Sequence, residues 1–204
     1  MATAVLAAMV LTFLLPSEVR VLPRWIMPAV EAFLLLAIVF ADPGEITRRE
    51  RWLRGLSIGL VVVLMANALW GTLLLIDQLV TGGSITNSAG ELLKAGTVVW
   101  LSLNIAFSLL YWELDGGGAA TRAHRLPRHP DFAFPQHMNN ALAPPRWRPR
   151  YVDYLYLAFT NAQAFSPTDV MPLVPWAKLT MATQSLVSLG ILSLVVARAV
   201  NVFS

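Results

Sequence analysis

Long runs of apolar residues, separated by short charged clusters, most constrain how this chain can fold. The runs cover residues 2–15, 25–41, 52–80, 91–114 and 176–202. A membrane-spanning helix needs roughly 20 predominantly apolar residues, because its backbone must satisfy all of its hydrogen bonds internally. Only 13% of the residues are charged, whereas a soluble domain carries roughly 25%. The sequence therefore predicts an all-α, polytopic helical membrane protein with five or six transmembrane helices.

The first two runs are short for a membrane span and carry an unusual polar residue. Pro16 directly follows the apolar run 2–15, which predicts a short or kinked first helix. Residues 25–41 are near the minimum length for a membrane span. The second run holds Glu31, and an ionisable residue at that depth is costly enough to suggest function. A protonated or paired Glu31 that packs against another helix is the alternative.

The third and fourth runs contain one central amide each. Asn67 is expected to hydrogen-bond to a neighbouring helix, which in membranes contributes roughly 0.6 kcal/mol per bond, and Asn104 lies at the centre of the fourth run. Together with Glu31, these two residues are the intramembrane polar groups on which a small proton-coupled transporter could depend. That transporter is one alternative for the function of the chain.

Arginine residues are concentrated in two of the loops. Residues 41–54 and 115–150 contain most of them, whereas residues 16–24 and 81–90, on the opposite side, contain few. The positive-inside rule therefore places the two arginine-rich loops in the cytoplasm. This bias explains the pI of about 9.7 without a nucleic-acid partner.

The chain is expected to contain three parts, which differ in composition. They are a four-helix transmembrane region (residues 1–114), a basic, Pro-rich loop (115–150) and a pore-like module (151–204). Cysteine is absent, which excludes disulfides and thiolate metal sites. No nucleophile elbow, phosphate-binding loop or zinc-protease His pair occurs, so neither an enzyme nor a bound cofactor is expected.

The 115–150 loop holds every histidine of the chain. His124, His129 and His137, together with Asp131, are the conceivable metal ligands. Their spacing matches no standard ligand pattern, and the surrounding prolines favour an extended surface loop, so no metal site is expected. Phe132 is expected to dip into the membrane interface or pack on the helices, as are Phe134 and Trp147.

The last part of the chain combines a short aromatic segment, a polar loop broken by prolines at residues 161–175, and a long apolar helix. Non-helical backbone persists within a bilayer only where protein buries it or it lines a water-filled cavity. Function is therefore most strongly expected in this part. Residues 151–167 either span the membrane, which gives six helices with both ends cytoplasmic and is slightly favoured, or form a re-entrant segment before the last helix.

This order of segments resembles the pore module of the potassium-channel superfamily. Asp169 aligns with the Asp that closes the selectivity filter, and Pro172 follows at the spacing of that family. Trp176 and Lys178 fall where members often have Trp and a basic residue. The resemblance implies a pore helix at residues 154–162 and an inner helix at 176–202.

The resemblance also implies a function: a channel-like protein in the bilayer, a homo-oligomer such as a tetramer, and passage of monovalent cations. The pathway would be lined by polar residues of the pore helix and filter, which are Thr160, Asn161, Gln163, Ser166, Thr168 and Asp169. Both filter glycines are replaced, by Ser166 and Thr168, and the tyrosine is replaced by Pro167. Potassium filters depend on backbone carbonyls held in geometries that favour glycine, so poor selectivity is expected.

The same stretch is similar to an uncharacterised family of bacterial integral membrane proteins with a Phe-Thr…Ser-x-Thr-Asp pattern before a final helix. This similarity supports the fold more than an activity, and implies a multi-pass protein of the bacterial inner membrane. The last helix also carries small and polar residues, which are Gln184, Ser185, Ser188, Gly190 and Ser193. Such residues let helices pack closely, and Gly190 is in addition a candidate gating hinge. A structural or accessory subunit that packs on a larger complex through the face around Gly190 is the remaining alternative.

Overall fold

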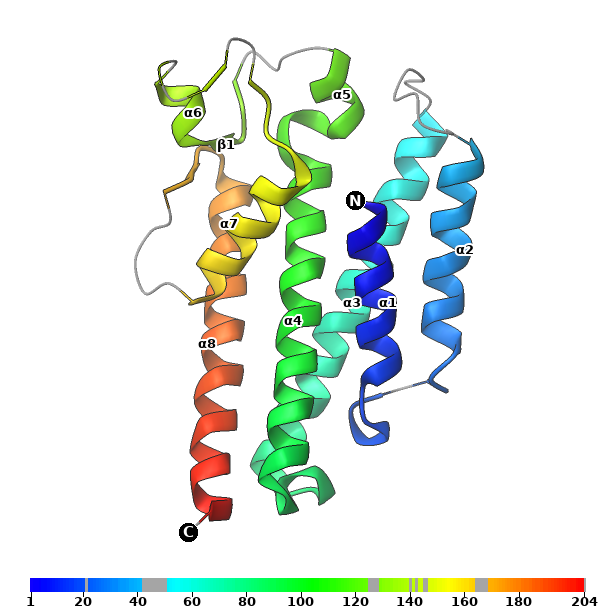
Figure 1. Cartoon of the computed structure of the whole chain (residues 1–204), viewed down its shortest axis with the longest axis vertical. Coiled ribbons are helices and arrows are strands. Elements are labelled where there is room, and N and C mark those ends of the chain that lie inside the picture. Colours follow the sequence, from blue (N-terminus) through cyan, green and yellow to red (C-terminus); the bar gives the residue numbers. More distant parts are fainter. Residues whose placement is uncertain are drawn as a thin grey trace.

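The computed structural model is an elongated helical bundle (Figure 1). It describes residues 1–20, 22–41, 51–124, 129–139, 141, 143–144, 147–163 and 169–203. The three longest helices are α3 (Arg51–Thr81), α4 (Ala89–Leu114) and α8 (Pro175–Phe203). Among the described residues these three are long and apolar enough to cross a membrane. The prediction of a helical fold is confirmed, and the three long helices fit a membrane protein by their length and composition.

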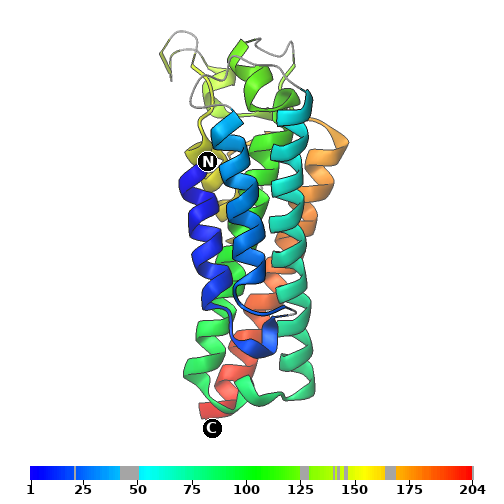
Figure 2. The ribbon, with the colours of Figure 1, turned by 90° about the vertical axis from the view of Figure 1, so that its right-hand side faces the viewer.

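Two shorter apolar helices form a hairpin at the amino-terminal end. Helix α1 (Ala2–Leu14) ends before Pro16, as expected, and a 3-10 turn (Ser17–Val19) leads towards α2 (Ile26–Ala41). Helix α1 contacts both α2 and α4, and α2 contacts α3. Figure 2 shows α1, α2 and α3 side by side, with α4 and α8 behind them.

The connections between the long helices contain specific turn residues. A 3-10 turn (Ser84–Asn87) joins α3 to α4, and the Ser88 hydroxyl accepts a hydrogen bond from the Glu91 amide at 3.5 Å. After α4 a second 3-10 turn (Asp115–Gly117) precedes α5 (Ala119–His124). Residues 116–118 are glycines with φ of 57°, 80° and 98°. This left-handed backbone is accessible to glycine at little cost, so the Gly triplet allows the chain to turn sharply there.

Helix α7 (Tyr151–Gln163) begins beside the carboxyl end of α4 and covers only part of its length (Figure 1). The short strands β1 (Phe132–Ala133) and β2 (Met171–Pro172) then pair antiparallel, near the four-residue helix α6 (Pro135–Met138). Strand β2, which directly precedes α8, therefore lies at the same end of the bundle as the start of α7. This path differs from the six-span arrangement, in which residues 168–175 would lie at the opposite end.

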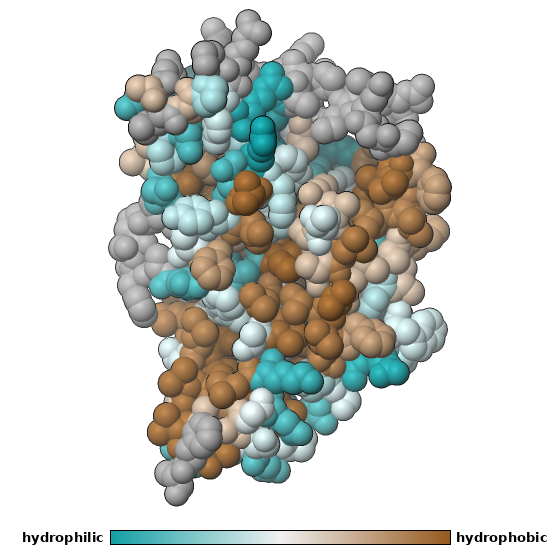
Figure 3. All heavy atoms as spheres, in the orientation of Figure 1, coloured by the Kyte–Doolittle hydropathy of each residue, from teal (hydrophilic) through white to brown (hydrophobic). Residues whose placement is uncertain are grey.

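The main hydrophobic core lies between α3, α4, α7 and α8, and a smaller one lies under the α1–α2 hairpin. Helices α4 and α8 approach closely at Gly96, where an added Cβ would lie 2.9 Å from Val195. Large apolar side chains also cover the outside: Phe40 is 81% exposed and Leu186 is 71% exposed. Hydrophobic residues dominate the middle of the face shown in Figure 3. A lipid bilayer accounts for so much exposed apolar surface.

Candidate functional site

A buried polar network joins α4, α7 and α8 around Gln184 of α8, and we call it the Gln184 network. The Gln184 side chain is fully buried. Its Oε1 accepts hydrogen bonds from the Tyr111 hydroxyl at 2.8 Å and from Asn161 Nδ2 at 2.9 Å. Its Nε2 donates to the Ala158 carbonyl at 2.8 Å and to Asn104 Oδ1 at 3.3 Å. One amide thus holds three helices together.

The other amides of the Gln184 network are paired as well. Asn161 Nδ2 also donates to the Met181 carbonyl at 2.9 Å, and Asn104 Nδ2 donates to the Trp100 carbonyl at 2.8 Å. Burying an amide without partners costs several kcal/mol in an apolar environment. The paired amides therefore fix the position of α7, and the sequence-predicted residues Asn104 and Asn161 meet through Gln184.

Tyr111, near the carboxyl end of α4, is the aromatic member of the Gln184 network. Its ring is fully buried, and its hydroxyl is bonded to Gln184. The face of α4 that carries Tyr111 is covered by α8 and by Phe132, whose ring lies 5.3 Å away. Tyr111 is therefore part of the junction of the three helices.

A second polar cluster lies at the carboxyl end of α4, around Asp115, which is 1% exposed. Asp115 Oδ2 accepts a short hydrogen bond from the Tyr154 hydroxyl of α7. Asp115 Oδ1 accepts hydrogen bonds from the backbone amides of Asp131 at 3.0 Å and Phe132 at 3.3 Å. The Asp131 carboxylate in turn accepts from the Gly116 amide at 2.9 Å. This cluster ties α7 and the 129–139 segment to α4.

Arg122 supplies the positive charge of this cluster. Its guanidinium lies 4.5 Å from the ring centroid of Trp112 and 5.1 Å from that of Tyr154, and it donates to the Asp115 backbone carbonyl. The side chain is 6% exposed. Cation–π contacts are stronger when desolvated, as here. The Arg122 side chain therefore holds α5 against α4 and α7.

Aromatic rings continue this packing across the end of the bundle. Phe132 lies 5.5 Å from Trp176 of α8, and Phe134 lies 5.3 Å from Tyr154 and 5.9 Å from Trp147, as measured between ring centroids. Phe132 and Phe134 are buried, which confirms that they pack on the helices. The two-stranded sheet and the rings close this end of the α4–α7–α8 unit.

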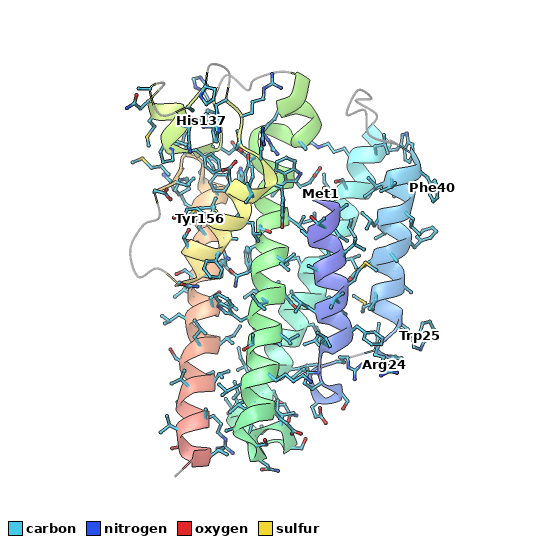
Figure 4. The ribbon with its side chains drawn as sticks, in the orientation of Figure 1. Met1, Arg24, Trp25, Phe40, His137 and Tyr156 are labelled. Atoms are coloured by element: carbon cyan, nitrogen blue, oxygen red, sulfur yellow. The ribbon has the colours of Figure 1, made fainter. Side chains whose placement is uncertain are left out.

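His137 lies in this layer and is labelled in Figure 4. Its ring is 5.2 Å from that of Trp147, and its Nδ1 accepts a hydrogen bond from the Phe134 amide at 3.4 Å. Partial burial lowers the pKa of His137, while the negative charge of Asp115 opposes that shift. The neutral ring is therefore favoured, as an accepting Nδ1 requires.

The other residues predicted to line a pathway lie in the last turn of α7 (Thr160 and Gln163) and after that helix (Ser166, Thr168 and Asp169). Thr160 is half-buried and its hydroxyl donates to the Tyr156 carbonyl at 2.9 Å, whereas Gln163 and Asp169 are exposed. Ser166 and Thr168 lie outside the described residues. Among the described side chains, no hydrogen bond joins Asp169 to Asn161 or Gln163.

Gln163 borders an open groove of about 440 Å³ between the end of α7 and α8. Ser185 and Ser193 of α8 also line this groove, with apolar side chains between them. Gln163, Ser185 and Ser193 thus place polar atoms in a groove that is otherwise apolar.

The polar residues of the amino-terminal half have separate surroundings. Asn67 Nδ2 donates to the Thr12 hydroxyl at 3.0 Å, which agrees with the expected helix-to-helix bond. Glu31 is fully buried, and neither carboxylate oxygen has a hydrogen-bond partner in the part of the chain that is described. Gly190 lies within the continuous helix α8, and a Cβ added there would meet nothing within 4 Å. Among the described residues, Gly190 is therefore not at a close helix–helix contact.

The described residues contain no group of three or more His, Asp or Glu side chains that could hold a metal ion. His129 is exposed, and nothing is described of the side chain of His124. Comparisons with protein-family models, curated proteins and solved structures found no match to this chain. The function is therefore inferred from the geometry of its own residues.

Proposed function

We propose that this multi-pass membrane protein is channel-like, with α4, α7, the return segment (residues 164–174) and α8 as its pore module. Helix α4 would be the outer helix, α7 the half-length pore helix and α8 the inner helix. One observation carries this proposal: α7 begins, and the return segment ends, at the same end of the bundle, where β2 pairs with β1. A helix, a half-helix, a return and a second helix make up a re-entrant pore unit.

Burial of the backbone supports an oligomer of this unit. Non-helical backbone at membrane depth needs protein or a water-filled cavity around it. In the single chain, Asp169 is exposed, Met171 is 54% exposed and Leu173 is 48% exposed. Further copies that pack around the outward face of α8 would cover this segment and enclose a pathway.

Side-chain chemistry favours cations as the species that pass. Among the described residues, Gln163 and Asp169 flank residues 164–168 on either side, and both side chains are exposed. Rings of carboxylates attract cations in channels. Because Ser166 and Thr168 stand where filter glycines would be, we expect monovalent cations to pass with poor selectivity.

Ion flux into liposomes that contain the purified protein tests this function. The protein should conduct K⁺ and Na⁺ at similar rates, and Asp169→Asn should reduce the flux. Asp77→Asn is the matched control, because Asp77 is an exposed carboxylate near the far end of α3. Flux no higher than that of protein-free liposomes, or equal flux for wild type and Asp169→Asn, would contradict the proposal.

A second candidate function, proton-coupled transport, is favoured by Glu31 alone. A carboxyl that is fully buried and unbonded within the described residues is what a proton carrier in a membrane needs. Uptake that depends on pH should then be lost in Glu31→Gln, whereas Asn67→Ala, which removes an amide that does not titrate and that bonds to Thr12, should retain its pH dependence. Unchanged pH dependence in Glu31→Gln would remove this candidate.

A further inference from the structure

A pocket of about 190 Å³ lies at the turn of the α1–α2 hairpin, away from the α4–α7–α8 unit. Its walls come from the end of α1, the segment that links α1 to α2, the first turn of α2 and the middle of α3. None of the proposed pore residues lines it. The pocket therefore needs an explanation of its own.

Two guanidinium groups line this pocket. Arg20 Nε donates to the Pro16 carbonyl at 3.2 Å, which leaves its terminal nitrogens available, and Arg24 lies 5.0 Å from the Phe13 ring centroid. Within the described part of the chain, neither head group forms an ion pair with a carboxylate. Two such groups at one pocket attract an anion that can accept several hydrogen bonds, such as a phosphate.

Two neutral polar side chains, those of Asn67 and Thr12, line the pocket together with the two arginines. Asn67 Nδ2 donates to the Thr12 hydroxyl, and both residues line the pocket. The Asn67 amide retains a second N–H, and the Thr12 hydroxyl retains its own proton for donation. The polar side thus presents donors, as an anion requires.

The rest of the pocket lining is apolar. It includes Met27, Ala66 and Trp70, and Ala66 and Trp70 belong to an exposed stripe of α3 that continues to Val62. The pocket is smaller than the roughly 300 Å³ of a typical ligand cavity, so it encloses a head group and not a whole amphiphile. An acyl chain attached to that head group would lie along the stripe.

The position of the pocket agrees with a membrane interface. Trp25 is 65% exposed and Trp70 is 51% exposed, as expected for aromatic residues at the level of lipid head groups. Figure 4 shows Arg24 and Trp25 together at one end of α2, with Phe40 at the other end. The arginine-rich loops follow the Phe40 end, so the positive-inside rule does not account for Arg20 and Arg24.

We propose that this pocket binds the phosphate head group of an anionic phospholipid from the leaflet opposite the arginine-rich loops. Arg20 and Arg24 hold the phosphate, Asn67 and Thr12 donate to its remaining oxygens, and the acyl chains follow α3. A net negative head group is selected over a zwitterionic one, because the described pocket offers two cations and no carboxylate to pair with an ammonium.

Lipid binding to the purified full-length protein tests this site. Phosphatidylglycerol should bind and raise the melting temperature, whereas phosphatidylcholine and inorganic phosphate at equal concentration should have little effect. In Arg20→Gln/Arg24→Gln, binding of phosphatidylglycerol should weaken by roughly tenfold or more, since two charge-assisted contacts are lost. The control Lys94→Gln/Lys178→Gln removes two exposed positive charges elsewhere and should bind as wild type does.

A variant that keeps both arginines guards against loss of folding. Ala66→Phe places a ring in the pocket and should also weaken phosphatidylglycerol binding, while the protein elutes as wild type on gel filtration. Wild-type affinity in both pocket variants, or equal binding of phosphatidylcholine, would overturn the proposal. Equal stabilisation by inorganic phosphate would show that a soluble anion occupies the site, which also overturns it.

Discussion

Gln184 is the residue on which the junction of α4, α7 and α8 depends. Replacement by Leu would leave the Tyr111 hydroxyl, the Asn104 Oδ1 and the Ala158 carbonyl without their partner. We expect Gln184→Leu to lower the free energy of unfolding by about 1–3 kcal/mol, the cost of leaving buried polar groups unpaired. Thermal unfolding in detergent measures the loss. The exposed Gln163→Leu is the control, and equal melting temperatures for the two variants would contradict this role of Gln184.

His137 should make the aromatic end of the bundle sensitive to acid. Its pKa is lowered in the folded protein, so its contribution to stability is complete above the unfolded value of about 6.5 and is lost as the pH falls below it. The melting temperature of wild type should therefore fall between pH 7.5 and pH 5.5 by more than that of His137→Gln. An identical pH dependence for the two proteins would show that His137 does not contribute.

Two residues of the Gln184 network were predicted from the sequence, and two were missed for a geometric reason. Asn104 was identified because it is an amide at the centre of an apolar run, and Asn161 because it lies in the segment that resembles a pore helix. Tyr111 and Gln184 were not assigned to a network, because a single helix does not show which neighbour covers each face. The spacing contained one signal: Tyr111 follows Asn104 by seven residues and Asn161 follows Tyr154 by seven, which places each pair on one helix face.

Helices α4 and α8 pack closely at Gly96, a glycine that the sequence analysis did not select. A Cβ on Gly96 would lie 2.9 Å from Cγ2 and 3.1 Å from Cγ1 of Val195, whereas one on Gly190 would meet nothing within 4 Å. Gly96→Ala should therefore destabilise the protein by about 1–3 kcal/mol through overpacking. Gly190→Ala should be neutral, or stabilising by about 0.5–1 kcal/mol, as alanine is favoured over glycine in helices.

A double variant separates packing from other effects of the Gly96 substitution. Val195→Ala should restore much of the stability lost in Gly96→Ala, because it removes Cγ1 and Cγ2, the two atoms that the new Cβ would approach most closely. Thermal unfolding of the four proteins forms a double-mutant cycle. Purely additive losses would mean that α4 and α8 do not approach as closely as described.

The positions of the helices followed from the sequence, but the pairing of distant segments did not. Apolar runs placed α3, α4 and α8 to within a few residues, because length and hydropathy are properties of one segment. The pairing of Phe132 with Pro172, and of Asp115 with Tyr154, depends on how loops and helices meet in space. These contacts explain why α7 runs along only part of the length of α4.

For the whole molecule, we propose that the chain enters the membrane at α7 and returns to the same side before α8 begins. The β1–β2 pair and the Asp115 cluster hold both ends of this segment, residues 151–174, at the carboxyl end of α4. A spanning α7 would instead place Asp169 at the opposite end, near the turn that joins α3 to α4. The two arrangements differ in the side of the membrane on which one exposed residue lies.

Labelling with a membrane-impermeant thiol reagent measures that side directly, because the chain has no cysteine of its own. Single variants Met138→Cys and Asn87→Cys mark the two ends of the bundle, since both positions are exposed. We expect Asp169→Cys to be labelled from the same side as Met138→Cys, in intact cells and in inverted vesicles. Labelling of Asp169→Cys from the side of Asn87→Cys would contradict the re-entrant segment and, with it, the pore module.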